Sequence, residues 1–334
     1  MCGIAGQVRW DRAPVERGLV ERMCAALEHR GPDSRGIHLS DGAGLGIQRL
    51  RVIDVETGDQ PLYNEDGSVA VVLNGEIYNY RELRRELARR GHSFRTQGDT
   101  EVIAHLYEER GPDCVRELDG MFALALWDER RRLLLVARDR VGKKPLFYSL
   151  RDGALSFSSE LGSLLQDDEV PRDLDPEAID RYLAYHYVPA PMSAFRAVRK
   201  LEPATRMVVQ NGRASFERYW QLDYSEKTDP SGLNERIRHE LRRAVERRLV
   251  SDVPLGAFLS GGIDSSAVVA AMAEASSGPV KTFSIGFEDE TFDELEHARL
   301  IAERFGTDHT EFVVRPDGIE LLPKLVRHYG EPFA

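Results

Sequence analysis

Residues 256–275 read GAFLSGGIDSSAVVAAMAEA, and this stretch decides the fold class of the sequence around it. The short apolar run Gly256–Leu259 is typical of a buried strand, and Asp264–Ala275 predicts a helix. The turn Ser260-Gly261-Gly262 between them offers backbone N–H groups, hydroxyls and a helix N-terminus, which suit an anionic phosphate. A helix start capped by its own aspartate and serines is the alternative. The Walker phosphate loop is excluded, because no GxxxxGK is present.

The sequence on either side extends this strand–turn–helix unit. A charged helix, Leu233–Val250, is predicted before it, and the strand Val280–Phe287 after it. The helix Asp293–Phe305 follows, with apolar residues at three- and four-residue steps, and His309–Val314 is the next candidate strand. Strands that alternate with helices in this way predict parallel βαβ units and therefore an α/β, parallel-sheet domain of the nucleotide-binding type.

The first two hundred residues have a different, α+β character. Two amphipathic helices, each ended by a glycine, are predicted at Tyr80–Arg90 and Thr100–Arg110. Short apolar runs bounded by turn residues predict strands, with the last two forming a hairpin around an arginine-rich turn: Gly44–Ile53, Val69–Leu73, Met121–Trp127 and Leu133–Ala137.

A polar, turn-rich segment, Gln221–Gly232, separates the two patterns. Together with the chain length of 334 residues, it predicts two domains. We place them at residues 2–217 and 236–334, with a linker at 218–235.

Composition excludes several classes of function. The 45 basic and 56 acidic residues give a net charge of −11, which argues against a protein that binds nucleic acid through its phosphates. No apolar run approaches the ~20 residues of a membrane helix, and no secretory signal is visible. Three distant cysteines form no disulfide framework, and the histidines lack the HxxxH and HExxH spacings of zinc sites. We therefore expect a soluble, cytoplasmic, two-domain globular protein.

Cys2 is the first candidate nucleophile. Removal of Met1, which occurs when the second side chain is small, leaves a chain that begins with cysteine. The α-amine, with a pKa near 8, can then accept the proton of the thiol on the same residue, and no histidine is needed. Taken alone, an early cysteine is more often a buried apolar residue.

Three further polar positions each allow two interpretations. Asn74-Gly75 is typical of a type I′ hairpin turn, but an amide beside an exposed backbone N–H also makes an oxyanion hole. Arg49 is either a salt-bridged arginine or a clamp for a substrate carboxylate. Asp99 is either the N-cap of a helix or the partner of a substrate ammonium.

Together these residues resemble a known family. The N-terminal region is similar to the class II glutamine amidotransferase domain, an N-terminal-nucleophile hydrolase with an αββα sandwich. The resemblance implies Cys2 as nucleophile, with its own α-amine as base. It assigns the oxyanion hole to Asn74 and Gly75, and glutamine binding to Arg49, Leu50, Ile53, Asn74, Glu76 and Asp99. The matching segments are Cys2-Gly3-Ile4, His29–Asp33, Arg49-Leu50, Asn74–Asn79, Asp99–Glu101, Asp119–Ala123 and Gly142–Tyr148; we interpret His29–Asp33 and Gly142–Tyr148 as structural.

The second motif, SGGIDSS, resembles the pyrophosphate loop of ATP pyrophosphatases. The resemblance implies that Asp264 is a Mg²⁺ ligand, since hard oxygen ligands suit this ion. It places Leu259 and Ile285 against the adenosine. The implied ATP-binding residues are Leu259, Ser260, Gly261, Gly262, Asp264, Ser265, Ser266 and Ile285.

A class II glutaminase followed by this loop resembles glutamine-hydrolysing asparagine synthetases. The resemblance covers Cys2 to Ala334. It implies that glutamine is hydrolysed at Cys2 and that ammonia passes internally to a second site, where it displaces AMP from an aspartyl-adenylate. ATP and Mg²⁺ are the implied cofactors, and a homodimer is compatible with it.

The sequence departs from that family in one respect. A second acidic loop of the form S-G-[ED]-G-x-D-E is absent from these residues, so we expect the second domain to be incomplete at its C-terminus. Alternatives therefore stay open: an amidotransferase with another carboxylate acceptor, a chain with glutaminase activity alone, or a non-catalytic remnant. Cys2, Arg49, Asn74 and Asp99 together argue against the remnant.

Overall fold

The computed structural model describes residues 1–11, 13–225, 227, 229–287, 294–315 and 318–333. The chain forms two compact units, Met1–Leu222 with Leu322–Ala334, and Asp223–Leu321. Asp293, the predicted first residue of a helix, and Ala334, the last residue of the resemblance, lie outside the described residues, as do positions 226 and 228 of the predicted linker.

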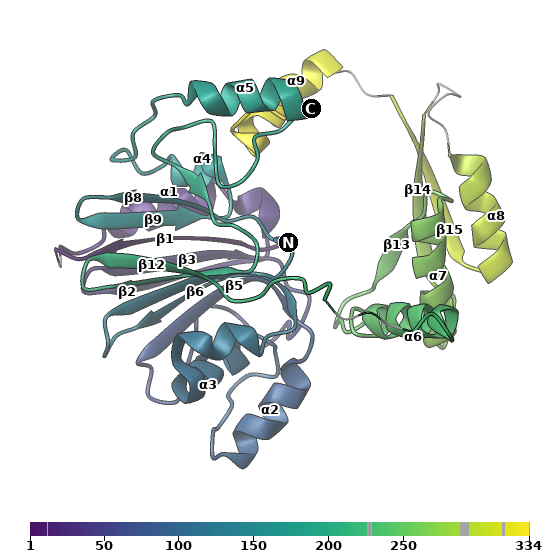
Figure 1. The fold of residues 1–334 in the computed structure, drawn as a ribbon, viewed down its shortest axis with the longest axis horizontal. Coiled ribbons are helices and arrows are strands. Elements are labelled where there is room, and N and C mark those ends of the chain that lie inside the picture. The colour runs from purple at the N-terminus through teal and green to yellow at the C-terminus, as the bar shows by residue number, and fades with distance from the viewer. Residues whose placement is uncertain (12, 226, 228, 288–293, 316–317, 334) are drawn as a thin grey trace. The chain divides into compact units, whose positions relative to one another are not determined.

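Two six-stranded sheets, in which every strand pair is antiparallel, form the first unit (Figure 1). One sheet has the order β10-β8-β9-β1-β3-β2, with bounds β1 Gly3–Arg9, β2 Ser34–Ser40, β3 Ala43–Arg49, β8 Phe147–Arg151, β9 Ala154–Ser158 and β10 Arg199–Lys200. The other has the order β12-β11-β7-β6-β5-β4, with bounds β4 Leu62–Tyr63, β5 Val69–Ile77, β6 Gly120–Asp128, β7 Leu133–Arg138, β11 Thr205–Gln210 and β12 Arg213–Arg218.

The main core lies between these sheets, because alternate residues of both point inward. Buried side chains from the first sheet (Ile4, Leu45) and the second (Val72, Trp127) belong to one apolar cluster. Helices α1 (Arg17–Ala25) and α4 (Leu161–Leu164) pack on the outer face of the first sheet. The second sheet contacts α3 (Glu101–Arg110), which packs against α2 (Tyr80–Arg89).

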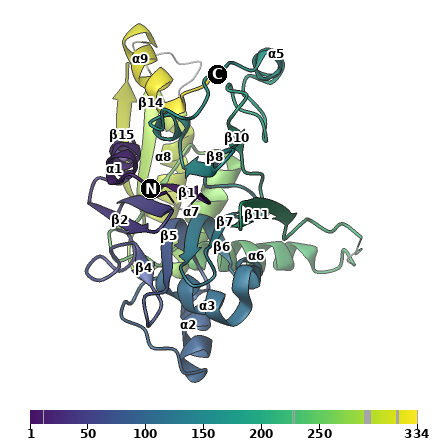
Figure 2. The ribbon, with the colours of Figure 1, turned by 90° about the vertical axis from the view of Figure 1, so that its left-hand side faces the viewer.

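The unit is therefore the predicted αββα sandwich. Helices α2 and α3 lie side by side at the end remote from α5 (Pro176–Tyr185), as both views show (Figures 1 and 2). The 3₁₀ turns η1 (Glu28–Arg30) and η2 (Gly111–Arg116) complete this unit together with the C-terminal part of α9 (Gly318–Tyr329).

The turn interpretation of Asn74-Gly75 is wrong. Strand β5 runs without interruption through both residues and pairs them with Ala123 and Phe122 of β6. Nine ladder pairs with a buried neighbouring strand outweigh the local preference of an Asn-Gly pair for a turn. The two residues therefore lie at a fixed place in a sheet.

Replacement of Gly75 by alanine is expected to destabilise this sheet strongly. The new Cβ would lie 2.0 Å from the Met121 carbonyl oxygen, and paired backbone cannot give way as a flexible side chain can. We expect a loss of about 3 kcal/mol or more in the free energy of unfolding, measured by urea denaturation. The control is Gly67→Ala in the neighbouring turn, where no atom lies within 4 Å and φ is +76°; its cost should be about 1 kcal/mol. Equal losses would contradict the steric explanation.

The second unit contains a parallel sheet of order β13-β14-β15, with strands Gly256–Phe258, Lys281–Phe287 and Asp308–Val314. Helices α7 (Ile263–Ala275) and α8 (Leu295–Phe305) connect them, so the predicted βαβ arrangement is confirmed. The preceding helix α6 (Leu233–Glu246) ends four residues before the predicted Val250. In the part of the chain that the structure describes, no helix is long and apolar enough to cross a membrane.

Candidate active site

A cavity of about 210 Å³ opens in the first unit at one end of the sandwich. Its lining comes from the residues before β1, the end of β3 and the loop after it, the C-terminal end of β5 and the loop before α3. All the residues predicted to serve the glutaminase line it: Cys2, Arg49, Leu50, Ile53, Asn74, Gly75, Glu76 and Asp99. Segments nearly one hundred residues apart thus converge on one small space. A larger cavity of about 500 Å³ in the same unit contains none of them.

The Cys2 thiol lies against the backbone of Leu50. Its Sγ is 3.6 Å from the Leu50 carbonyl oxygen, to which it donates, and 3.4 Å from the Leu50 N–H, from which it accepts. Burial raises the pKa of this thiol, and the Leu50 N–H, the chain's terminal amine and the Arg49 guanidinium act in the opposite direction. The terminal amine, here on Met1, has a pKa lowered by burial. A base close to Cys2 is therefore needed to form a thiolate near neutral pH.

Asn74 is fully buried, and the oxygen of its amide has no hydrogen-bond partner among the described residues. Nδ2 donates to the Ser159 hydroxyl at 3.4 Å, whereas Oδ1 is buried without a hydrogen bond from any described residue. A half-turn of the amide exchanges Nδ2 and Oδ1 with little change of shape. The side chain can thus present a donor to the cavity beside the backbone of Gly75, as an oxyanion hole requires.

Arg49 is nearly buried and forms the ion pair that was one of its two predicted alternatives. Its Nη1 forms an ion pair with Asp59 at 2.6 Å, and its Nη2 donates to the carbonyl oxygens of Ile53 and Asp54. These contacts fix the guanidinium against one wall of the cavity. The salt-bridged arginine is therefore observed, whereas the binding of a substrate carboxylate by Arg49 stays a prediction.

Asp99 is not a helix cap. Helix α3 begins at Glu101 with Thr100 as its N-cap, and the Asp99 carboxylate instead accepts the backbone N–H of Ile77 at 2.9 Å. Burial raises the pKa of Asp99 to about 6, and the nearby Glu76 carboxylate adds to the shift. A cationic ligand in the cavity would lower this pKa again.

Two residues at the site lie in loops interpreted from sequence as structural. Arg30 donates from Nε to the Cys2 carbonyl oxygen at 2.9 Å, which holds the residue that carries the thiol. Lys144 lines the cavity, and its pKa is lowered by burial, although the nearby Glu76 carboxylate acts in the opposite direction. The sequence signal that could have identified Arg30 and Lys144 is the presence of a basic residue inside each of the two matching segments, His29–Asp33 and Gly142–Tyr148.

The SGGIDSS segment of the second unit forms the predicted turn between β13 and α7. Ser260 Oγ lies 3.0 Å from Ser265 Oγ and accepts the Gly262 N–H. Gly261 has φ +80°, and a Cβ there would lie 2.5 Å from His297 of α8, so a glycine is needed at this position. Ser266 Oγ is buried and has no hydrogen-bond partner among the described residues.

The remaining predicted ATP residues surround this turn. Leu259 is buried, and its backbone bonds to β14 through Phe283 and Ser284. Ile285 lies further along β14 with about half of its surface exposed, and Asp264 is exposed in the first turn of α7. The turn and the strand ends thus bring together an apolar surface, hydroxyl groups and one carboxylate.

Comparison with known proteins agrees with this two-part architecture. Residues 1–220 match the family model described as "Glutamine amidotransferase domain", and residues 236–334 match "Asparagine synthase". The chain is 36% identical to asparagine synthetase [glutamine-hydrolyzing] 1 of Bacillus subtilis, with all of this chain and 54% of that protein covered. It is also 36% identical to a putative asparagine synthetase [glutamine-hydrolyzing] 2 of Methanocaldococcus jannaschii, with all of this chain and 69% of that protein covered.

The chain therefore spans about half to two thirds of the length of these curated relatives. A solved structure, titled as the allosteric regulatory enzyme of purine biosynthesis, is similar in fold, with a TM-score of 0.51 at 14% identity. That likeness covers 94% of this chain and 90% of the other.

Proposed function

Since the chain belongs to the family of glutamine-hydrolysing asparagine synthetases, we propose that it catalyses the reaction of that family. L-Glutamine, L-aspartate, ATP and water would give L-glutamate, L-asparagine, AMP and diphosphate. We assign the glutaminase to residues 2–217 and the synthetase to residues 236–334. The observation that carries the proposal is the convergence of a thiol, an amide, a guanidinium and a carboxylate on the 210 Å³ cavity.

The glutaminase step follows from this arrangement. After removal of Met1, the α-amine of Cys2 takes the thiol proton, and the sulfur attacks the amide carbon of glutamine. Asn74 and the Gly75 N–H hold the oxyanion that forms. The C–N bond then breaks, and the nitrogen leaves as ammonia with the proton returned by the amine. Water hydrolyses the thioester to glutamate and restores the thiol.

The same cavity can orient glutamine by its two charges. The Arg49 guanidinium would bind the α-carboxylate, and Asp99, with Glu76, would receive the α-ammonium. The backbone from Leu50 to Ile53 would line the space between them. This places both charged groups of the substrate on partners of opposite sign.

Glutamine binding should weaken as the pH falls through about 6, the pKa to which burial raises Asp99. Below that value the carboxyl group is neutral and no longer attracts an ammonium, so the dissociation constant should rise by nearly tenfold per pH unit. Calorimetry with the Cys2→Ala chain measures this without turnover. Asp99→Asn should bind glutamine weakly with no such pH dependence. A constant affinity across that pH range would contradict the assignment.

The second unit would bind ATP. The glycine turn, the serine hydroxyls and the N-terminus of α7 suit the phosphates, and the buried Ser266 hydroxyl has no hydrogen-bond partner among the described residues. Leu259 and Ile285 would contact the adenosine. The exposed Asp264 fits Mg²⁺, which proteins commonly bind through one or two carboxylates together with substrate phosphates. Bound Mg²⁺ would neutralise phosphate charge there.

Three finer parts of the proposal rest on the family resemblance: the Mg²⁺ ion, a cytoplasmic location and a homodimer. The aspartate site and the path of ammonia belong to the same proposal. The names of the relatives support asparagine as the product.

The test uses amide-¹⁵N glutamine, aspartate and Mg-ATP, with both products measured by mass spectrometry. We expect glutamate and labelled asparagine in equal amounts. In the matched variant, Asp264→Ala, asparagine should fall strongly while glutamate release persists. Glutamate without asparagine in the unchanged chain would contradict the synthetase assignment and leave the glutaminase, and the absence of both products would contradict the whole proposal.

A further inference from the structure

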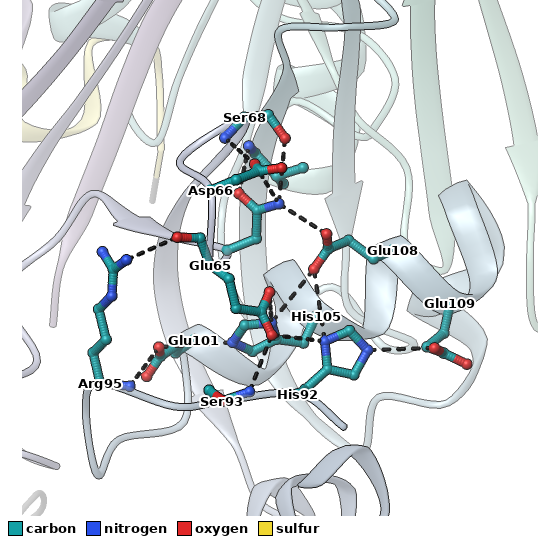
Figure 3. Close-up of polar contacts among 12 residues, drawn as sticks. Glu65, Asp66, Ser68, His92, Ser93, Arg95, Glu101, His105, Glu108 and Glu109 are labelled. Carbon is teal, nitrogen blue, oxygen red and sulfur yellow. Dashed lines mark hydrogen bonds and ion pairs between the residues drawn. The ribbon is translucent and has the colours of Figure 1, made fainter. Parts of the chain in front are cut away.

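Two histidines and two glutamates form a cluster away from the cavity (Figure 3). Glu65 comes from the turn between β4 and β5, His92 from the loop after α2, and His105 and Glu108 from α3. One ligand atom from each of the four lies within 4.8 Å of all the others. The residues at positions 105 and 108 are on one face of the helix, because their spacing is one turn.

The distances within this cluster suit four ligands around one ion. His105 Nδ1 is 3.1 Å from Glu65 Oε2 and 3.4 Å from Glu108 Oε2. His92 Nδ1 is 3.0 Å from Glu65 Oε1 and 3.8 Å from Glu108 Oε2. Tetrahedral Zn²⁺, with bonds of about 2.0–2.1 Å, separates its ligands by about 3.3 Å. The observed separations lie on either side of that value.

His105 distinguishes this cluster from an ordinary network of ion pairs. Its side chain is fully buried, and neither ring nitrogen forms a hydrogen bond with any described residue. Both carboxylates are close to Nδ1, yet neither is aligned to accept an N–H. In a metal-free site the ring could pair with these carboxylates only when protonated, and its buried nitrogens would still lack a well-aligned hydrogen bond, which is costly. A metal ion bound between His105, Glu65 and Glu108 would be coordinated by the lone pair of His105 Nδ1.

Groups behind the four ligands hold them as the outer shell of a metal site does. The Glu109 carboxylate lies 3.3 Å from His92 Nε2, and Glu101 lies 3.7 Å from His105 Nε2. The Asn64 amide donates to Glu108 Oε1 at 2.8 Å, and the Ser93 N–H donates to Glu65 Oε1 at 3.0 Å. Hydrogen bonds thus hold His92, Glu108 and Glu65, and Glu101 is the carboxylate near the far nitrogen of His105.

From this arrangement we propose that Glu65, His92, His105 and Glu108 bind one divalent transition-metal ion of the zinc class. The two carboxylates compensate its charge and the two neutral imidazoles add nitrogen donors, and this mixed nitrogen and oxygen set suits Zn²⁺. The spacing rule that argued against zinc looks for two histidines on one helix. Here the four ligands come from three segments. The ion would join the β4–β5 turn and the loop after α2 to α3.

Calorimetric titration of the full chain with Zn²⁺ tests the proposal. The Cys2→Ala background removes the accessible thiol as a competing ligand. We expect one ion per chain, tetrahedral Co²⁺ absorption on substitution, and a rise of about 5–10 °C in the unfolding midpoint at metal concentrations near 100 times Kd.

His92→Gln and Glu65→Gln, both outside the buried His105 position, should each weaken binding by at least tenfold while the far-UV spectrum stays unchanged. The matched control, His328→Gln, removes an imidazole from the separate group His29, Glu160 and His328, which lacks a fourth ligand among the described residues, and should leave the affinity unchanged. Absence of binding, or affinity lost in the control and retained in the two variants, would overturn the proposal.

Discussion

Replacement of Cys2 by alanine is expected to lower the rate of glutamine hydrolysis by at least about a thousandfold. The thiol lines the cavity and is the group that we propose attacks the amide carbon, and no other cysteine lines that space among the described residues. Alanine is small, so Met1 can still be removed and the α-amine is retained. Glutamate release measures the effect, and any ammonia-dependent activity should persist.

Cys24→Ala is the matched control for this variant. Cys24 is buried against β3, and burial raises the pKa of its thiol to about 12, so it is not a nucleophile near neutral pH. We expect its glutaminase rate to stay within a few fold of the unchanged chain. Turnover preserved in Cys2→Ala would remove Cys2 from the mechanism.

Asn74→Ala should lower kcat for glutamine hydrolysis by about 100- to 1000-fold with little change in KM. The amide is proposed to hold charge that exists only after the sulfur attacks, so its loss affects the transition state more than the bound substrate. Steady-state kinetics over a range of glutamine concentrations separates the two parameters.

Ser159→Ala controls for loss of packing around this amide. It removes the hydroxyl that accepts from Asn74 Nδ2 and leaves the amide itself in the cavity. We expect a much smaller fall in kcat in this variant. An increase in KM alone in Asn74→Ala would show that Asn74 binds glutamine without stabilising the oxyanion.

Local sequence signals were sufficient for the alternating strands and helices from α6 to β15, and for part of the first unit: β3, β5, β6, β7, α2 and α3. The glycine turn between β13 and α7 depends on residues adjacent in sequence, as do the caps at Gly91 and Gly111. The hairpin of β6 and β7 likewise follows from two apolar runs around one polar turn. These turns and helix ends involve residues close together in the chain, so the conformational preferences of single residues determine where they form.

The site residues were identified because their order along the chain resembles a family, whereas each alone allowed an ordinary structural interpretation. Tertiary structure decided between those interpretations. Pairing with β6 places Asn74-Gly75 in a strand, and burial beneath the cavity turns Asp99 from a helix cap into a carboxyl group with a raised pKa. The strand that pairs with Asn74-Gly75 and the backbone that bonds to Asp99 are both distant in sequence. Local sequence preferences therefore do not predict the conformation of either site.

The sequence by itself determined the two-part architecture, because the spacing of apolar residues in strands and helices is a local property of the chain. It also determined the candidate nucleophile, because the cysteine directly follows the initiator methionine. Only the tertiary structure decided which charges meet. The ion pair of Arg49 with Asp59 and the cluster around His105 depend on how separate segments pack, and the desolvation that shifts a pKa exists only after that packing.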